Sequence, residues 1–263
     1  MSNIPKKIHY CWFGGNPLPE LAKKCMESWK KYCPDYEIIQ WNESNFDLNC
    51  CDYVKEAYAA KKWAFVSDVA RLYALVNFGG VYMDTDVEVV KPLDVFLDCE
   101  AFSGFESETD IPTGIMASRA HHPLFEELLR DYDNAHFLRE DGTPDTTTNV
   151  IRITEICLKY GLVRNNTLQT VGGFTLYPKD YFCPKDNKTA KVMLTENSHT
   201  IHHFDGSWLP KEERDFEKLR AKMGKYLPST VANYLSRAAM AVKHRGFSGL
   251  VETAKNFLKK RTK

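Results

Sequence analysis

Apolar positions along the chain alternate between short continuous runs and stretches that repeat every three or four residues. The short runs indicate strands, and the three- and four-residue spacing indicates helices. Strands are expected at 7–13, 36–41, 81–83, 87–90, 101–105, 114–118 and 200–204, and helices at 21–32, 64–78, 123–135 and 149–160. Because the two kinds of segment alternate, the pattern predicts an α/β sheet with helices packed on it.

The segment 64–78 is apolar on nearly every face, which predicts a buried helix. Its exceptions are Asp68 and Arg71, which lie three residues apart and therefore share a face. The pair has two readings: a buried ion pair that satisfies itself, or a carboxylate and a guanidinium that hold a ligand rich in hydroxyl groups. Gly79-Gly80 supplies the helix stop.

Asp84 and Asp86 follow the strand expected at 81–83. Residues two apart in an extended chain point to the same side, so the two carboxylates repel unless a cation or a donor shares them. A hard divalent ion, Mg²⁺ or Mn²⁺, bound jointly with a substrate diphosphate would do so. The alternative is a solvated turn.

Two further segments carry candidate site residues. His202 and His203 stand at the end of the last expected strand, ahead of Trp208, and a histidine there is suited to complete a metal site. A hydrogen-bonded core histidine is the alternative. Trp12 precedes the Gly14-Gly15 turn and is either a stacking platform for a nucleobase or a core residue.

Charge divides the chain unevenly. The 263 residues carry 35 basic and 35 acidic side chains, 43% are hydrophobic and 27% are charged. Residues 218–263 hold twelve Lys or Arg and one Glu, a net charge of +11, which leaves −11 on residues 1–217. We therefore expect a catalytic domain over 1–217 and a basic helical tail over 218–263, with no nucleic-acid partner.

The tail has two apolar stripes at helical spacing. One comprises Val231, Tyr234, Leu235, Ala238 and Val242, and the other comprises Leu250, Val251, Ala254, Phe257 and Leu258. An apolar stripe beside a basic face is typical of a helix at a membrane surface, so an anionic membrane is one expected partner. The alternative is that the stripes pack on the catalytic domain or on a second subunit, which leaves an oligomer open.

The cysteines and the N-terminus indicate a cellular location. The eight cysteines form no C-x-x-C pair, and several lie in apolar stretches, which favours reduced thiols. No N-terminal segment resembles a signal peptide, and no run is long enough to cross a membrane. We expect a cytoplasmic protein that is peripheral on the inner face of the plasma membrane if the tail binds lipid.

The candidate residues together resemble the DXD-motif sugar transferases of glycosyltransferase family thirty-two. This family includes bacterial capsular and extracellular polysaccharide enzymes and is distantly similar to the glucosyltransferase domain of large glucosylating toxins. The matching segments are Ile4 to Gly15, Ser67 to Leu72, Gly79 to Asp86, and His202-His203 with Trp208. The resemblance covers about residues 4–210.

The resemblance implies a GT-A fold, with a Rossmann-like nucleotide-binding half joined to an acceptor half. It also implies that Trp12 contacts the base and that Asp68 and Arg71 hold the donor sugar. Asp84 would contact ribose or donor hydroxyls, while Asp86 would bind the metal and His203 would complete its shell. Only one of the two adjacent histidines can face the site. Trp208 and Asn149 are further expected donor contacts.

The implied activity is a retaining transfer of a hexose or an N-acetylhexosamine. The metal would act on the diphosphate leaving group, with help from Arg71 and without a protein base. We expect a UDP-sugar donor and a glycan or lipid-linked oligosaccharide acceptor in surface polysaccharide synthesis. The alternatives are a protein acceptor, phosphoryl transfer, and a non-catalytic module that binds sugar or membrane.

Overall fold

The computed structural model describes residues 3–112, 114–186, 189–206, 209 and 211–243. These form two compact units, one made of residues 1–184 and 194–203 and the other of residues 185–193 and 204–263. The domain boundary expected at residue 217 falls inside helix α7 (Lys211–Gly224) of the second unit.

The first unit is built on a seven-stranded mixed sheet in the order β2-β1-β3-β6-β5-β8-β7. Its strands are β1 (Lys7–Cys11), β2 (Glu37–Trp41), β3 (Gly80–Met83), β5 (Ala101–Gly104), β6 (Ile115–Ser118), β7 (Gln169–Val171) and β8 (Phe174–Tyr177). The strands β2, β1 and β3 are parallel, whereas β6 runs antiparallel to both β3 and β5. The chain therefore leaves β3 and β5 at the same edge of the sheet.

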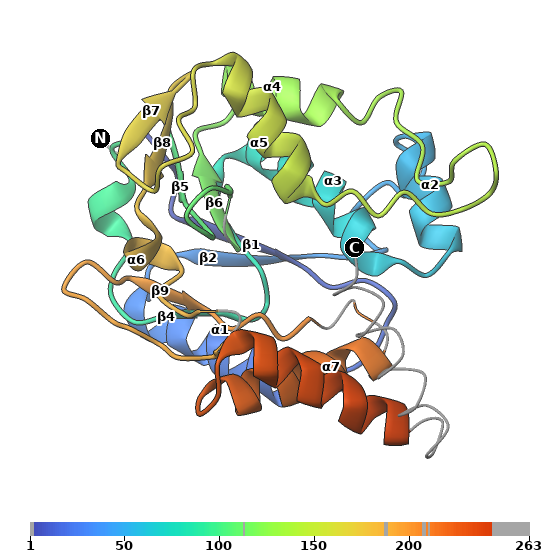
Figure 1. Cartoon of the computed structure of the whole chain (residues 1–263). Helices are drawn as coiled ribbons and strands as arrows, with labels where there is room; N and C mark the ends of the chain where they lie inside the picture. The colour runs from blue at the N-terminus through green and yellow to red at the C-terminus, as the bar shows by residue number, and fades with distance from the viewer. Residues whose placement is uncertain (1–2, 113, 187–188, 207–208, 210, 244–263) are drawn as a thin grey trace. The chain divides into compact units, whose positions relative to one another are not determined.

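Helices cover one face of this sheet. Figure 1 shows α3 (Trp63–Phe78), α4 (Pro123–Arg130) and α5 (Asn149–Lys159) on this face, with α2 (Asp52–Ala59) beside α3. They enclose a core that includes Tyr53, Leu72, Phe125 and Phe174, all fully or almost fully buried. The predicted α/β class, a mixed sheet flanked by helices, is confirmed.

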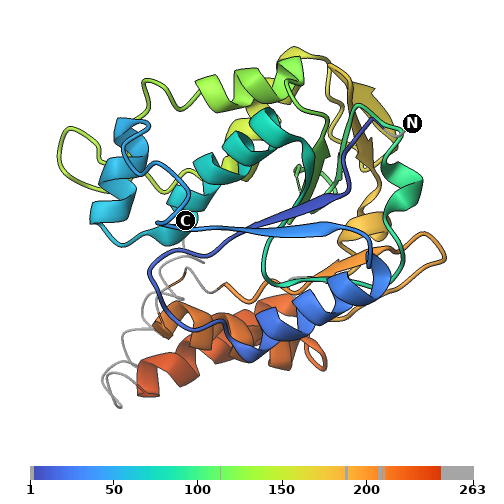
Figure 2. The ribbon, with the colours of Figure 1, turned by 180° about the vertical axis from the view of Figure 1, so that it is seen from behind.

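The other face carries α1 (Glu20–Tyr32) and a small antiparallel sheet of β4 (Val87–Val89) and β9 (Thr200–His202), as Figure 2 shows from behind. Trp29 of α1 donates its indole N–H to the Val87 carbonyl at 2.7 Å. The Val89 amide donates to the Ser28 hydroxyl at 2.9 Å. These bonds fix β4 against α1, directly after the Asp84-Thr85-Asp86 triplet.

The end of α3 depends on a residue without a side chain. Gly79 has a φ of 61°, and a Cβ there would lie 2.7 Å from the Ala120 nitrogen. The predicted Gly79-Gly80 stop is thereby confirmed, since the chain must turn directly from α3 into β3.

The predicted helices and strands are found with their ends moved. The helix expected to reach residue 135 ends as α4 at Arg130, and the strand expected at 7–13 ends at Cys11. Several short elements escape the sequence pattern: α2, β7, β8, the 3₁₀ turn Asp94–Phe96 and α6 (Lys179–Phe182).

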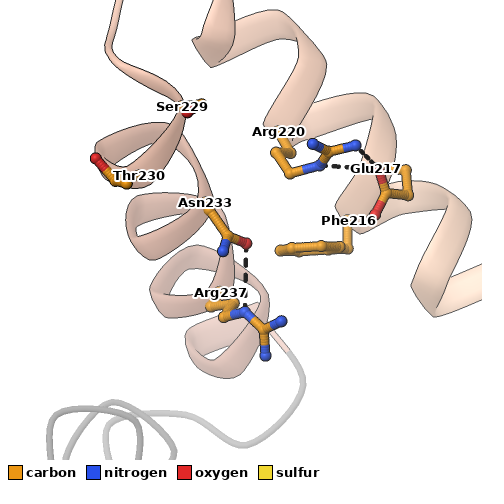
Figure 3. Close-up of a pocket in the computed structure, with 7 residues that line it drawn as sticks. All are labelled: Phe216, Glu217, Arg220, Ser229, Thr230, Asn233 and Arg237. Atoms are coloured by element: carbon orange, nitrogen blue, oxygen red, sulfur yellow. Dashed lines mark hydrogen bonds and ion pairs between the residues drawn. The ribbon is translucent and has the colours of Figure 1, made fainter. Parts of the chain in front are cut away.

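In the second unit, α7 is followed by a helix over residues 229–243. A groove of about 420 Å³ lies between these helices, lined by Phe216, Glu217, Arg220, Ser229, Thr230, Asn233 and Arg237. Figure 3 shows Arg220 paired with Glu217, and Arg237 bonded to Asn233. The groove contains none of the predicted site residues. No helix in the described part of the chain is long and apolar enough to span a bilayer.

Candidate active site

The triplet that follows β3 is a turn, because the Val87 amide donates to the Asp84 carbonyl at 3.0 Å. The Asp84 amide donates to the Gly114 carbonyl at 2.9 Å, which ties the turn to the residue before β6. The Tyr82 hydroxyl donates to Asp84 Oδ1 at 3.0 Å. The two aspartates thus face one side through a tight turn rather than through extended geometry.

Three side chains converge at this turn. Asp84, Asp86 and His202 each offer one ligand atom, and these atoms all lie within 4.8 Å of one another. His202 Nε2 is 3.5 Å from Asp86 Oδ1. Two carboxylates and an imidazole suit a divalent cation such as Mn²⁺ or Mg²⁺.

The structure places the side chain of His202, and not that of His203, beside Asp84 and Asp86, whereas the resemblance implied His203 as the metal ligand. The pairing of His202 with Val87 in the β4–β9 ladder places its side chain at the turn. His203 instead bonds Glu88 Oε2 through Nε2 at 2.8 Å, and its amide donates to the Asp86 carbonyl at 3.0 Å. The alternation of adjacent residues in extended chain separates the two rings.

Two residues near His202 were not predicted from the sequence. Glu106 Oε2 lies 3.8 Å from His202 Nδ1, and Cys183 is hydrogen-bonded to His202. Glu106 follows β5, whose carboxyl end lies at the same sheet edge as that of β3. An acidic residue directly after a second strand was therefore a usable signal, whereas nothing around Cys183 pointed to the site.

Arg71 joins the turn to α3. Its Nη2 is 3.2 Å from Asp68 Oδ1 and 3.3 Å from Asp84 Oδ1. The guanidinium also lies over the Tyr82 ring, 4.6 Å from its centroid. Neither reading of the Asp68–Arg71 pair is complete, because the Arg71 guanidinium also pairs with Asp84.

Asp68 is buried beside the start of α5. The Asn149 amide at that helix N-terminus donates a hydrogen bond to the Asp68 carboxylate, and the Asn149 side chain is itself buried. Asn149 was predicted as a sugar contact, and the structure brings it to Asp68.

Charge in this small volume shifts several pKa values. Burial raises the pKa of Asp68 to about 7, against the opposing effect of Arg71. Burial also raises the pKa of Glu106, and the nearby Asp84 and Asp86 carboxylates add to it. For His202 burial opposes the charged form, but Asp86 outweighs it and holds the pKa well above its ordinary value. Such concentrated shifts are typical of functional sites.

The two tryptophans stand differently. Trp12 is half-buried, and its indole N–H donates to the Asn16 carbonyl at 2.6 Å, which orients the ring beside the Gly14-Gly15 turn. Its role as a base platform stays a prediction. Trp208 lies outside the described residues.

Residues 19–103 match the family described as a glycosyltransferase sugar-binding region containing the DXD motif. This segment includes Asp68, Arg71, Asp84 and Asp86.

Curated relatives are similar to about half of the chain. The chain is 30% identical over 142 residues to inositol phosphoceramide mannosyltransferase 3 of Schizosaccharomyces pombe, covering 51% of this chain and 40% of the relative. It is 29% identical over 135 residues to mannosyl phosphorylinositol ceramide synthase CSH1 of Saccharomyces cerevisiae, covering 48% and 35%. The chain therefore spans less than half the length of these relatives.

Among solved structures, the glycosyltransferase PaToxG matches with a TM-score of 0.41 and 22% identity, covering 48% of this chain and 59% of that one.

Proposed function

We propose that the protein is a metal-dependent, retaining glycosyltransferase that moves a hexose or an N-acetylhexosamine from a UDP-sugar to a glycan or a lipid-linked oligosaccharide. The observation that carries the proposal is the convergence of Asp84, Asp86 and His202, with Arg71 bridging Asp84 to the buried Asp68. A role in surface polysaccharide synthesis rests on the family resemblance.

In this proposal Asp84, Asp86 and His202 hold the divalent cation. When bound, that ion neutralises the negative charge of the diphosphate leaving group. Arg71 adds positive charge at the same edge of the sheet, and its position is fixed by two carboxylates and the Tyr82 ring. Asp68 accepts hydrogen bonds from sugar hydroxyls, and Trp12 stacks on the base. No side chain is assigned as a general base.

The named relatives favour a second candidate for the donor and acceptor. Both are described as enzymes that mannosylate inositol-phosphate-containing ceramides. A mannosyl nucleotide donor and an acceptor with a phosphoinositol headgroup therefore belong in any test. Hexose donors differ in the position of single sugar hydroxyls, and a site discriminates between them by whether each hydroxyl finds its hydrogen-bond partner.

The deciding experiment is hydrolysis of UDP-glucose, UDP-galactose, their N-acetyl forms and GDP-mannose with Mn²⁺. Release of nucleoside diphosphate with free sugar supports the transferase. Release of inorganic phosphate or sugar phosphate indicates a phosphohydrolase, and no release indicates a binding module. Adding glycan, phosphoinositol-lipid and protein acceptors then identifies the acceptor.

Matched variants test the metal site in the same assay. Asp86→Asn and His202→Ala each remove a ligand, so hydrolysis should fall by about 100-fold or more and Mn²⁺ affinity should weaken in calorimetry. Glu88→Gln and His203→Ala change the neighbouring pair, and these variants should keep the parent's rate of hydrolysis and its Mn²⁺ affinity. Equal losses in His202→Ala and His203→Ala would contradict the assignment.

We also propose that the second unit docks on an anionic membrane from the cytoplasmic side. Val231, Leu235 and Val242 are 42%, 39% and 46% exposed, so part of one predicted apolar stripe faces solvent within the described chain. The other predicted stripe, at 250–258, lies outside the described residues. All eight cysteines are unpaired, which supports a cytoplasmic location.

A further inference from the structure

Four buried polar groups without a hydrogen-bond partner in the described chain belong to residues that interact with Asp68. They are the hydroxyls of Tyr53 and Tyr132, Asn149 Nδ2 and Arg152 Nε. Tyr53 is 0% exposed and Tyr132 is 2% exposed, so neither hydroxyl reaches bulk solvent. Buried polar groups are normally paired, and a cluster of unpaired ones indicates bound water or a bound ligand.

The two rings are held rigidly. Tyr53 of α2 and Tyr132, just after α4, pack edge to face with their centroids 4.9 Å apart. The Arg152 guanidinium lies 5.6 Å from the first centroid and 5.1 Å from the second. Arg152 is fixed in turn by ion pairs with Asp131 at 3.0 Å and Asp145 at 3.4 Å. The hydroxyls therefore have little freedom to find another partner.

Both hydroxyls lie within the electrostatic reach of Asp68. The pKa of each tyrosine is raised, first by burial and then by the Asp68 carboxylate. The Asp68 carboxylate accepts bonds from Asn149 N–H and lies 3.2 Å from Arg71. A carboxylate offers about four acceptor positions, so room remains for water and for a ligand.

We propose that Tyr53, Tyr132 and Asn149 are positioning residues for the donor sugar, which hold buried water that donates hydrogen bonds to Asp68. This proposal rests on the proposed transferase function, in which Asp68 binds sugar hydroxyls. The water accepts from the tyrosine hydroxyls and donates to the carboxylate, so that Asp68 keeps one rotamer and its ionised form is favoured. Residues from α2, the turn after α4 and the start of α5 thereby fix the position of the Asp68 carboxylate.

The test uses Tyr53→Phe and Tyr132→Phe, which keep both rings and remove only the hydroxyls. In each variant kcat/KM for nucleotide-sugar hydrolysis should fall about tenfold, the equivalent of one hydrogen bond to a charged group. The affinity for UDP alone should stay unchanged, because UDP lacks the sugar. The double variant should lose less than the product of the single losses, since the hydroxyls share water. Tyr226→Phe, at an 83% exposed site, is the matched control.

Two readouts do not need activity and separate this proposal from the transferase proposal. A high-resolution crystal structure should show ordered water bonded to a tyrosine hydroxyl and to Asp68, and carboxyl NMR should show a higher Asp68 pKa in Tyr132→Phe. The neighbouring charged groups Arg71, Asp84 and Arg152 are unchanged in that variant.

If the Phe variants keep full kcat/KM and unfold at higher temperature, the hydroxyls have no partner and the proposal fails. If UDP affinity and stability fall together, the role is structural. An inactive parent protein would overturn the function alone.

Discussion

Arg71 is shared between two carboxylates that serve different parts of the candidate site. It lies 3.2 Å from Asp68 and 3.3 Å from Asp84, and its side chain is only 9% exposed. A buried charge is tolerated only with partners, so removal of either carboxylate leaves the other pair altered as well. Variants of Asp68 and Asp84 should therefore be strongly non-additive with variants of Arg71.

The raised pKa of Asp68 predicts a pH-dependent stability. Its pKa is about 7 in the folded protein, against about 3.9 in an unfolded chain. Between these values the folded state binds more protons, so the free energy of unfolding falls as pH rises from about 4 to about 7, by up to about 4 kcal/mol. Sugar-donor binding changes in the opposite direction, because protonated Asp68 loses acceptor capacity.

Urea unfolding of the parent and of Asp68→Asn across this pH range checks the prediction. The variant should lack the fall with rising pH, whereas Asp133→Asn, at an exposed site, should retain it. Identical pH profiles in the parent and Asp68→Asn would show that another group is responsible.

Most single residues of the candidate site could be predicted from the sequence. Asp68, Arg71, Asp84 and Asp86 lie in one place, as the family resemblance implied. The choice between His202 and His203 could not be made, because it depends on the register of β9 against β4. Glu106 was missed although an acidic residue after an expected strand is a usable signal, because only the strand order shows that β5 ends at the same sheet edge as β3.

The strand β9 places His202 beside the triplet, because it pairs with β4. Gly114 packs against this pair, and a Cβ on it would lie 2.9 Å from Val87 Cγ2 and 3.1 Å from His202 Cδ2. Only a residue without a side chain allows the Asp84 amide to bond the Gly114 carbonyl while the imidazole lies this close.

Gly114→Ala should therefore displace the His202 ring and weaken Mn²⁺ binding about tenfold, with a stability loss of about 1–3 kcal/mol from overpacking. Calorimetric metal titration and thermal unfolding measure the two effects. Gly104→Ala is the matched control, because its Cβ would lie 2.9 Å from Phe182 and not near His202. If both variants weaken metal binding equally, general destabilisation is the cause.

The helices with regular apolar spacing and the strands with apolar runs were predicted, whereas several other short elements were not. The buried α3 and the strands around it follow from their apolar positions. By contrast, the three residues of β7 include one apolar side chain, Val171, and the four residues of α6 make about one helical turn, so neither shows an apolar run or a period. Helix α2 begins at Asp52 without a side-chain cap, which removes the usual sequence signal for a helix start.

For the whole molecule, the uneven charge and the exposed stripe of the second unit predict membrane binding. Leu235→Glu places a charge in this stripe and should weaken binding to anionic liposomes about tenfold or more in sedimentation assays, while leaving donor hydrolysis unchanged. Val163→Glu alters a 57% exposed valine of the first unit and is the matched control. Liposome binding that is unaffected by salt and by Leu235→Glu would contradict membrane docking through this stripe and would favour a protein partner for it.

The separation of the triplet from His202 along the chain has a consequence for folding kinetics. The segment that matches the sugar-binding family ends at residue 103, and β9 joins β4 only when the chain has reached His202. Pairing across such a long loop carries a large closure entropy and is slow compared with local structure. During synthesis the triplet and Arg71 would be in place well before the histidine arrives. The ability to bind metal should therefore appear in the last phase of refolding, and fragments ending before residue 202 should fold their helices without gaining it.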